Sequence, residues 1–160
     1  MAIRTGDPVP DVTFTVMTPE GPAAKTSSEI FNGKTVLLFA VPGAFTPTCH
    51  QKHLPGYLAE YDAIKAKGVD TIACVAVNDI FVLNAWAQSQ DAGDRILMLA
   101  DGNGEFAKSV GLDVDLSRFG MGVRSNRYSM VVVNGVVRGL NIEQPGKLEV
   151  STAANTLCQL

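Results

Sequence analysis

The sequence lacks the patterns of a membrane, secreted or multidomain protein. No window holds the roughly 20 apolar residues that a membrane helix needs, and the longest apolar run, 36–42, is only strand-sized. The polar amino terminus, 1–9, has no charged-then-apolar secretory signal. No repeat, low-complexity tract or linker divides the 160 residues. We therefore expect one cytoplasmic domain over 1–160 that does not act at a membrane.

Basic residues are also too few to create a general positive field. The chain has 13 Lys and Arg against 16 Asp and Glu, for a net charge of −3, which argues against nucleic acid as a partner. A small basic cluster at Arg124 and Arg127 is the local exception. Because 46% of the residues are hydrophobic, the composition is that of a globular enzyme rather than a disordered chain.

Cysteine is scarce, and no CxxC pair is present. The three cysteines, Cys49, Cys74 and Cys158, are an odd number. In a reducing compartment such cysteines are more often free thiols than structural disulfides. A catalytic, redox or buried role stays open for each on these grounds alone.

The hydrophobic pattern predicts an α/β fold with a mixed sheet flanked by helices. We expect strands at 35–41, 69–77, 96–100, 128–133 and 136–140, and helices at 48–67, 80–90, 104–110 and 148–159. Pro55 should kink or interrupt its helix. Asn134-Gly135 suits a type I′ turn, and so predicts a hairpin between the last two strands.

Cys49 occupies the predicted start of a helix, directly after a buried strand and a turn-rich loop. A thiol must be ionised to act as a nucleophile, and a free cysteine with a pKa of about 8.5 is mostly protonated at neutral pH. The first turn of a helix offers unpaired N–H groups and the positive end of its dipole. Pro47 suits this start, since its missing N–H needs no partner there. These features favour a reactive Cys49.

The loop before Cys49 carries further candidates for peroxide chemistry. The Thr46 hydroxyl can donate and accept at once, and so could hold a peroxide oxygen against the sulfur. Pro42 and the Gly43 turn would shield the thiolate from water. Spacing alone favours equally a simple strand-to-helix loop with an inert, buried cysteine behind it.

The pattern Pro42-x-x-x-Thr46-x-x-Cys49 resembles the active-site motif of the peroxiredoxins. The run VPGAFTPTCHQKHLPGY over 41–57 is similar to their type 5, or plant type II, group. The resemblance continues through 68–70, 77–82 and 120–128. It covers essentially the whole chain, with motifs that agree in order and spacing.

This resemblance implies a thioredoxin-like fold and a thiol peroxidase that reduces hydrogen peroxide and alkyl hydroperoxides in antioxidant defence, with no cofactor or metal. Cys49 would be the peroxidatic cysteine, which becomes a sulfenic acid. Thr46 would orient the peroxide, Pro42 would shield the site, and Arg124 would hold the thiolate and polarise the O–O bond. Arg127 is left out of this catalytic set, as a residue that structures the loop or meets a partner.

The resemblance also bears on how the oxidised cysteine is reduced. Cys74 matches the second cysteine of plant type II relatives, and is the candidate resolving residue, although its place in a strand is typical of simple packing. Cys158 does not match the resolving position of animal type 5 proteins, which aligns near Val150, and we expect it to be non-catalytic. A disulfide between Cys49 and Cys74 would need the helix start to unwind. Glutaredoxin with glutathione, or thioredoxin, is the expected reductant, the first slightly favoured.

Three further expectations complete the sequence-based interpretation. The family implies a homodimer, and Phe45, 80–81 and 116–119 resemble the segments used there, although they are equally compatible with core packing. His50 and His53 are expected to have a helix-surface or packing role, because the resemblance implies no histidine base and no third ligand is evident for a metal. The alternative function is a thiol–disulfide oxidoreductase or redox-sensing module on the same fold.

Overall fold

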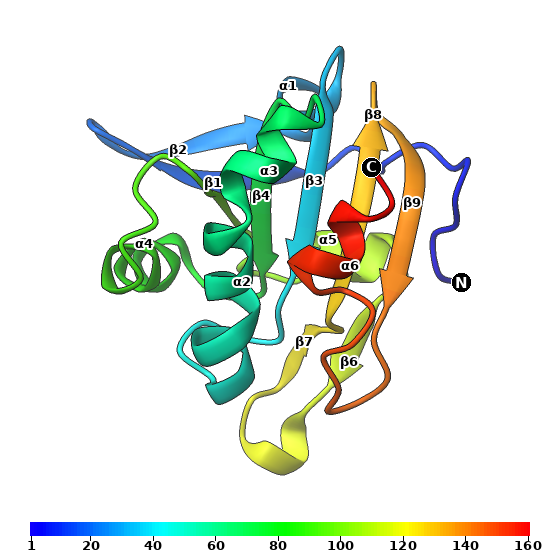
Figure 1. The fold of residues 1–160 in the computed structure, drawn as a ribbon. Coiled ribbons are helices and arrows are strands. Elements are labelled where there is room, and N and C mark those ends of the chain that lie inside the picture. The colour runs from blue at the N-terminus through cyan, green and yellow to red at the C-terminus, as the bar shows by residue number, and fades with distance from the viewer.

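A computed structural model describes all residues 1–160 and has a seven-stranded sheet at its centre (Figure 1). The strand order is β2-β1-β5-β4-β3-β8-β9. These strands are β1 Thr13–Thr18, β2 Gly21–Thr26, β3 Thr35–Ala40, β4 Thr71–Ala76, β5 Leu97–Ala100, β8 Tyr128–Val133 and β9 Val136–Ile142. A separate two-stranded ribbon joins β6 Asp113–Asp115 to β7 Val123–Ser125.

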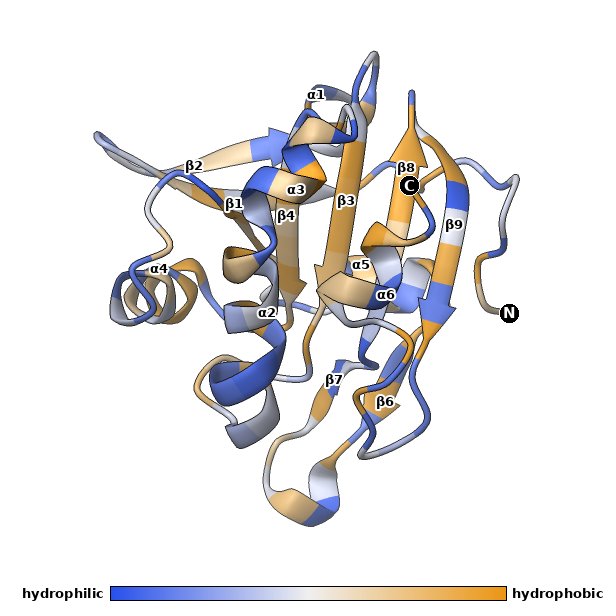
Figure 2. Cartoon of the chain, viewed as in Figure 1, coloured by the Kyte–Doolittle hydropathy of each residue, from blue (hydrophilic) through white to orange (hydrophobic).

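The sheet is mixed, as the sequence predicts. β3, β4 and β5 run parallel to one another, whereas β8 lies antiparallel to β3, and β9 antiparallel to β8. The central strands are apolar along nearly their whole length (Figure 2), which is typical of strands covered on both faces.

Helices cover both faces of the sheet (Figure 1). They are α1 Ser27–Phe31, α2 Leu54–Ala59, α3 Tyr61–Ala66, α4 Ile80–Ser89, α5 Glu105–Ser109 and α6 Ala153–Leu157. Alternate residues of β3 therefore enter two separate cores. Leu37 and Phe39 pack in the core that holds Cys49 and Cys74, whereas Leu38 and Ala40 pack in the other.

The predicted helix over 48–67 is divided into three segments. It begins as a π-helix, Cys49–His53, and continues as α2 and α3, with a break at Glu60. Pro55 accounts for the first division, because a proline has no N–H and its ring clashes with the carbonyl four residues earlier. The preceding turn is widened, and the Leu54 N–H donates to the Cys49 carbonyl, five residues back. Such π-turns are rare and frequently occur at functional sites.

The hairpin prediction is confirmed at Asn134-Gly135. Both residues have positive φ angles, 47° and 77°, as a type I′ turn requires. The amino-terminal segment then runs along this end of the sheet. Gly6 N–H donates to Val137 O at 2.8 Å, and Val137 N–H donates to Asp7 O at 2.9 Å.

Two parts of the fold differ from the prediction. The hairpin of β1 and β2 was not expected, although β1 alternates polar residues with the buried Phe14 and Val16, the pattern of a half-buried strand. The carboxy-terminal helix, expected over 148–159, is only α6 Ala153–Leu157. It begins where the Thr152 hydroxyl accepts from Asn155 N–H and caps it. No helix of the fold is long and apolar enough to cross a membrane.

Candidate active site

The loop between β3 and the π-helix holds Cys49 at the carboxyl end of the parallel strands. The loop is fixed to the neighbouring strand by Asn78, which follows β4 and accepts the Ala44 N–H at 2.9 Å. Asp79 caps α4 by accepting from Val82 N–H. Asn78 thus fixes the active-site loop, while Asp79 caps the helix.

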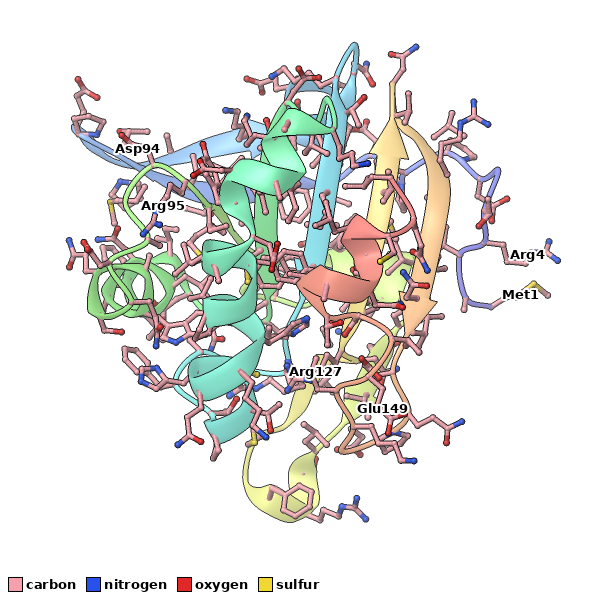
Figure 3. All side chains as sticks on the ribbon, in the orientation of Figure 1. Met1, Arg4, Asp94, Arg95, Arg127 and Glu149 are labelled. Atoms are coloured by element: carbon pink, nitrogen blue, oxygen red, sulfur yellow. The ribbon has the colours of Figure 1, made fainter.

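The Cys49 side chain is fully buried and contacts Arg127. Arg127 Nη2 donates to Cys49 Sγ at 3.1 Å. Arg127 precedes β8 and lies between the Cys49 helix and the carboxy-terminal loop (Figure 3). Because a guanidinium is permanently charged, this contact stabilises negative charge on the sulfur.

The structure corrects the choice between the two arginines. Arg124, in β7, donates from Nε to Met121 O at 2.8 Å and from Nη1 to Pro42 O at 3.4 Å. It joins the β6–β7 ribbon to the active-site loop, while Arg127 makes the contact with sulfur. Arg127, which the sequence interpretation leaves out, therefore enters the candidate site.

His53 contacts the guanidinium nitrogen of Arg127 that does not contact the sulfur. Its Nδ1 accepts from Arg127 Nη1 at 2.9 Å, and its Nε2 lies 3.0 Å from Ser151 O. An arginine N–H only donates and a carbonyl only accepts, so these partners assign the neutral imidazole with its proton on Nε2. Burial, and then the charge of Arg127, lower the pKa of His53 to about 4. The neutral imidazole therefore offers Nδ1 as a fixed acceptor for the guanidinium.

A carboxylate completes this chain of contacts. The Glu143 Oε2 atom accepts from Ser151 N–H and Oγ–H, both at 2.7 Å, and from Glu149 N–H at 2.8 Å. Although burial raises the pKa of Glu143, these hydrogen bonds outweigh it and hold the pKa below its ordinary value. The Tyr57 hydroxyl also donates to Ser151 O at 2.8 Å. The carboxy-terminal loop thus fixes His53, and through it Arg127.

Thr46, Pro42 and Gly43 belong to the loop that precedes Cys49 and lie next to Arg124 or to one another. The Thr46 hydroxyl donates its hydrogen to Gly43 O at 2.6 Å, so the lone pairs on its oxygen can accept a hydrogen bond from another donor. Gly43 is closely packed, because a Cβ there would lie 2.9 Å from Arg124 Nη1 and the arginine would have to shift. The sequence interpretation treats Gly43 as a turn residue; its closest neighbours show that it makes room for an arginine.

A cavity of about 410 Å³ opens beside these residues. Its lining includes Pro42, Thr48, Phe119, Arg127 and Lys147. This volume is at the small end of the range for ligand pockets. Nowhere in the fold do three His, Cys, Asp or Glu side chains converge in a metal-binding arrangement.

The other two cysteines have opposite environments. Cys74, in β4, is fully buried in the same core as Cys49. Burial, and then the nearby Cys49, raise the pKa of Cys74 well above its ordinary value. Cys158, after α6, is exposed. No disulfide joins any of them.

The segments expected at a dimer interface are only partly exposed. Phe45, Phe81 and Phe119 are 48%, 64% and 63% exposed, whereas Ile80 is buried. Phe45 also has a φ of 63°, which is uncommon for an aromatic residue. Its ring stacks on His50, with the ring centres 5.8 Å apart.

Comparison with known proteins gives consistent matches along the chain. The Redoxin family matches residues 4–157. "Peroxiredoxin-2E, chloroplastic" from Arabidopsis thaliana is 44% identical over 160 residues, which span 98% of this chain and 68% of that protein. The crystal structure of reduced Prx3 in complex with H₂O₂ from Vibrio vulnificus is 51% identical, with a TM-score of 0.95 and 98% of each chain covered. Peroxiredoxin 5 from Alvinella pompejana is 36% identical, with a TM-score of 0.86 over 98% of this chain and 96% of that one.

Proposed function

We propose that this chain, which belongs to the peroxiredoxins of the Redoxin family and is a thiol-dependent peroxidase, attacks its peroxide with Cys49 held by Arg127. The observation that carries this proposal is the 3.1 Å contact from Arg127 Nη2 to Cys49 Sγ. It places a permanent cation at one of the three cysteine thiols, and the loop before that cysteine carries the Thr46 hydroxyl.

The reaction begins when the Cys49 thiolate attacks the terminal peroxide oxygen. A sulfur–oxygen bond forms as the O–O bond breaks, and its electron pair leaves with the second oxygen, which takes a proton and departs as water or an alcohol. Negative charge therefore moves from sulfur to the leaving oxygen. Arg127 contacts the starting anion, and Thr46 can accept the peroxide O–H. Fixed groups of this kind stabilise a charge that moves in the transition state.

Hydrogen peroxide and alkyl hydroperoxides are the proposed substrates. A related structure from Vibrio vulnificus, 51% identical, is titled as a complex with H₂O₂. The cavity at Arg127 includes Phe119, Leu116 and Val114 in its lining, which offer apolar contacts to an alkyl group.

We further propose glutathione with glutaredoxin as the preferred reductant over thioredoxin. A resolving Cys74 would need to ionise, yet its burial raises its pKa. It would also have to reach a sulfur held in a folded helix. Both features favour an external thiol over a Cys49–Cys74 disulfide. A cycle that depends on such a thiol suits the reducing cytoplasm, where we place the protein.

Peroxide consumption by the wild type and by Cys49→Ser tests the central proposal. The variant should lose essentially all consumption, and a wild type that consumes no peroxide would refute it. Turnover of Cys74→Ser with each reductant tests the second step. Unchanged turnover with glutathione and glutaredoxin supports a one-cysteine cycle, and its loss with that pair would make Cys74 the resolving residue.

A homodimer is also proposed, since three large aromatic side chains, Phe45, Phe81 and Phe119, are about half or more exposed. Exposed apolar groups of this size are typical of interaction surfaces when they form a patch. Light scattering at working concentration should give twice the chain mass. A mass near one chain would contradict the dimer.

A further inference from the structure

A group of side chains beside Cys49 takes no part in the proposed peroxide chemistry. His50 follows Cys49 in the π-helix and contacts Trp86 and Gln90, from α4 and its carboxyl end. Trp86 Nε1 donates to His50 Nδ1 at 3.1 Å. Gln90 Nε2 lies 2.9 Å from the same Nδ1 and donates to His50 O at 2.9 Å. The ring and the main chain of His50 are thus both joined to α4.

The donors explain why these contacts matter to the helix. An indole N–H only donates, so His50 Nδ1 accepts and the ring proton lies on Nε2. Trp86 is fully buried, and its N–H would lose this partner if the Cys49 turn unwound. An unpaired buried donor is unfavourable. Unwinding is therefore opposed from α4 as well as from within the helix.

Pro55 makes the contact from Gln90 to the main chain necessary. At the end of the π-turn the Leu54 N–H donates five residues back, to Cys49 O. The next donor in this register would be residue 55, but proline has no N–H. The carbonyl of His50 is left without its helical partner, and Gln90 supplies the missing donor at 2.9 Å. The weakest point of the Cys49 helix is secured by a side chain outside it.

We propose that His50, Gln90 and Trp86 act as a latch that keeps the Cys49 helix folded after oxidation, and so directs the Cys49 sulfenic acid to an external thiol rather than to Cys74. His50 and Gln90 are positioning residues in this role. The proposal rests on Cys49 being the residue that peroxide oxidises. Cys49 and Cys74 share one core, but Cys49 is held in its helix, and a disulfide requires the two main chains to approach within about 7 Å in the right orientation.

The two competing reactions differ only in the attacking sulfur. An external thiolate attacks the sulfenic sulfur, an S–S bond forms, the S–O bond breaks, and hydroxide leaves with a proton as water. A second external thiol then releases the Cys49 thiolate. If Cys74 attacks instead, the same bonds form and break within the chain. The latch opposes the second route, because Cys74 is fixed in β4 and a disulfide with it requires Cys49 to move out of its helix.

Gln90→Met, with Gln88→Met as the matched control, tests the latch. Gln90 is only partly buried, and Gln88 is exposed on the same helix, so both variants should fold. Each protein is treated with one equivalent of hydrogen peroxide without reductant, and mass spectrometry measures the ratio of Cys49–Cys74 disulfide to Cys49 sulfenic acid. Removal of the Gln90 donor should raise this ratio about tenfold, as expected for the loss of one or two hydrogen bonds, whereas Gln88→Met should leave it unchanged.

A second variant, His50→Phe, keeps a ring for the stack on Phe45 but removes the acceptor of Trp86, and should shift the ratio the same way. Adding Cys74→Ser to Gln90→Met should abolish the disulfide. Equal ratios in the wild type, Gln90→Met and His50→Phe would overturn the latch while Cys49 is still oxidised in all three. Failure of the proposed function looks different, since Cys49 would then remain unoxidised in every protein.

Discussion

Replacement of Arg127 by glutamine should slow the attack on peroxide about 10²-fold, the value that follows from its contact with sulfur. Two unit charges 3.1 Å apart interact by about 5 kcal/mol at an effective dielectric constant of about 20. In the transition state part of the negative charge has moved from sulfur toward the leaving oxygen, so we expect the variant to lose about 3 kcal/mol of transition-state stabilisation rather than the full interaction. Because each 1.36 kcal/mol is a factor of about ten in rate, the expected decrease is about 10²-fold.

The assay is the single-turnover rate of Cys49 oxidation, followed by mass spectrometry of quenched samples under excess peroxide and without reductant. Arg124→Gln is the matched control, because Arg124 lies three residues away and bonds two carbonyls rather than the sulfur. Its effect should be several-fold smaller. A decrease of less than about threefold for Arg127→Gln, or an equal or larger decrease for Arg124→Gln, would refute the assignment of Arg127 to the thiolate.

Three other outcomes follow from single groups. The pKa of His53 is about 4 in the folded protein, against an ordinary value of 6.5. As the pH decreases, the unfolded chain therefore binds this proton first, and the free energy of unfolding should fall by about 3 kcal/mol between about pH 6.5 and about pH 4. Urea titrations across this range should show the decrease, and His53→Gln should remove most of it. The buried Tyr128 hydroxyl has no hydrogen-bond partner, so Tyr128→Phe should leave the free energy of unfolding unchanged or raise it by up to about 1 kcal/mol. Tyr57→Phe loses the hydrogen bond to Ser151 O and should instead lower the free energy of unfolding by about 1 kcal/mol. Thr46→Val removes the proposed peroxide acceptor and should lower the rate of Cys49 oxidation about 10²-fold with little change in thermal midpoint; a rate within twofold of wild type would remove Thr46 from the site.

The sequence predicts the centre of the fold well because its signals there are local. Continuous apolar runs produce β3 and β4, and Asn134-Gly135 produces the hairpin. The helical segment expected over 48–67 and its interruption near Pro55 are both confirmed, but the sequence did not show that the turn before Pro55 is a π-helix. β2, with the sequence GPAAKT, has little strand character of its own and owes its conformation to pairing with β1.

The choice between Arg124 and Arg127 depended on the register in which β3 pairs with β8, and the periodicity of hydrophobic residues does not reveal this register. Ala40, the last residue of β3, pairs with Tyr128, the first of β8. The residue before Tyr128 is therefore brought beside the loop that follows Ala40, and this residue is Arg127. A hypothesis about strand pairing would have selected it. The contacts of His53 could not be found from the sequence, because its partners, Arg127 and Ser151, lie 74 and 98 residues away.

The amino-terminal segment has a consequence for association between molecules. β9 ends one side of the sheet, and an edge strand with free N–H and C=O groups is a template for pairing with another chain. Residues 6–9 cover one end of this edge, through the bonds of Gly6 and Asp7 to Val137 and a bridge from Pro8 to Val136. Pro8 has no N–H to offer further strands. At the opposite edge, β2 contains Pro22. Both margins of the sheet therefore resist edge-to-edge aggregation.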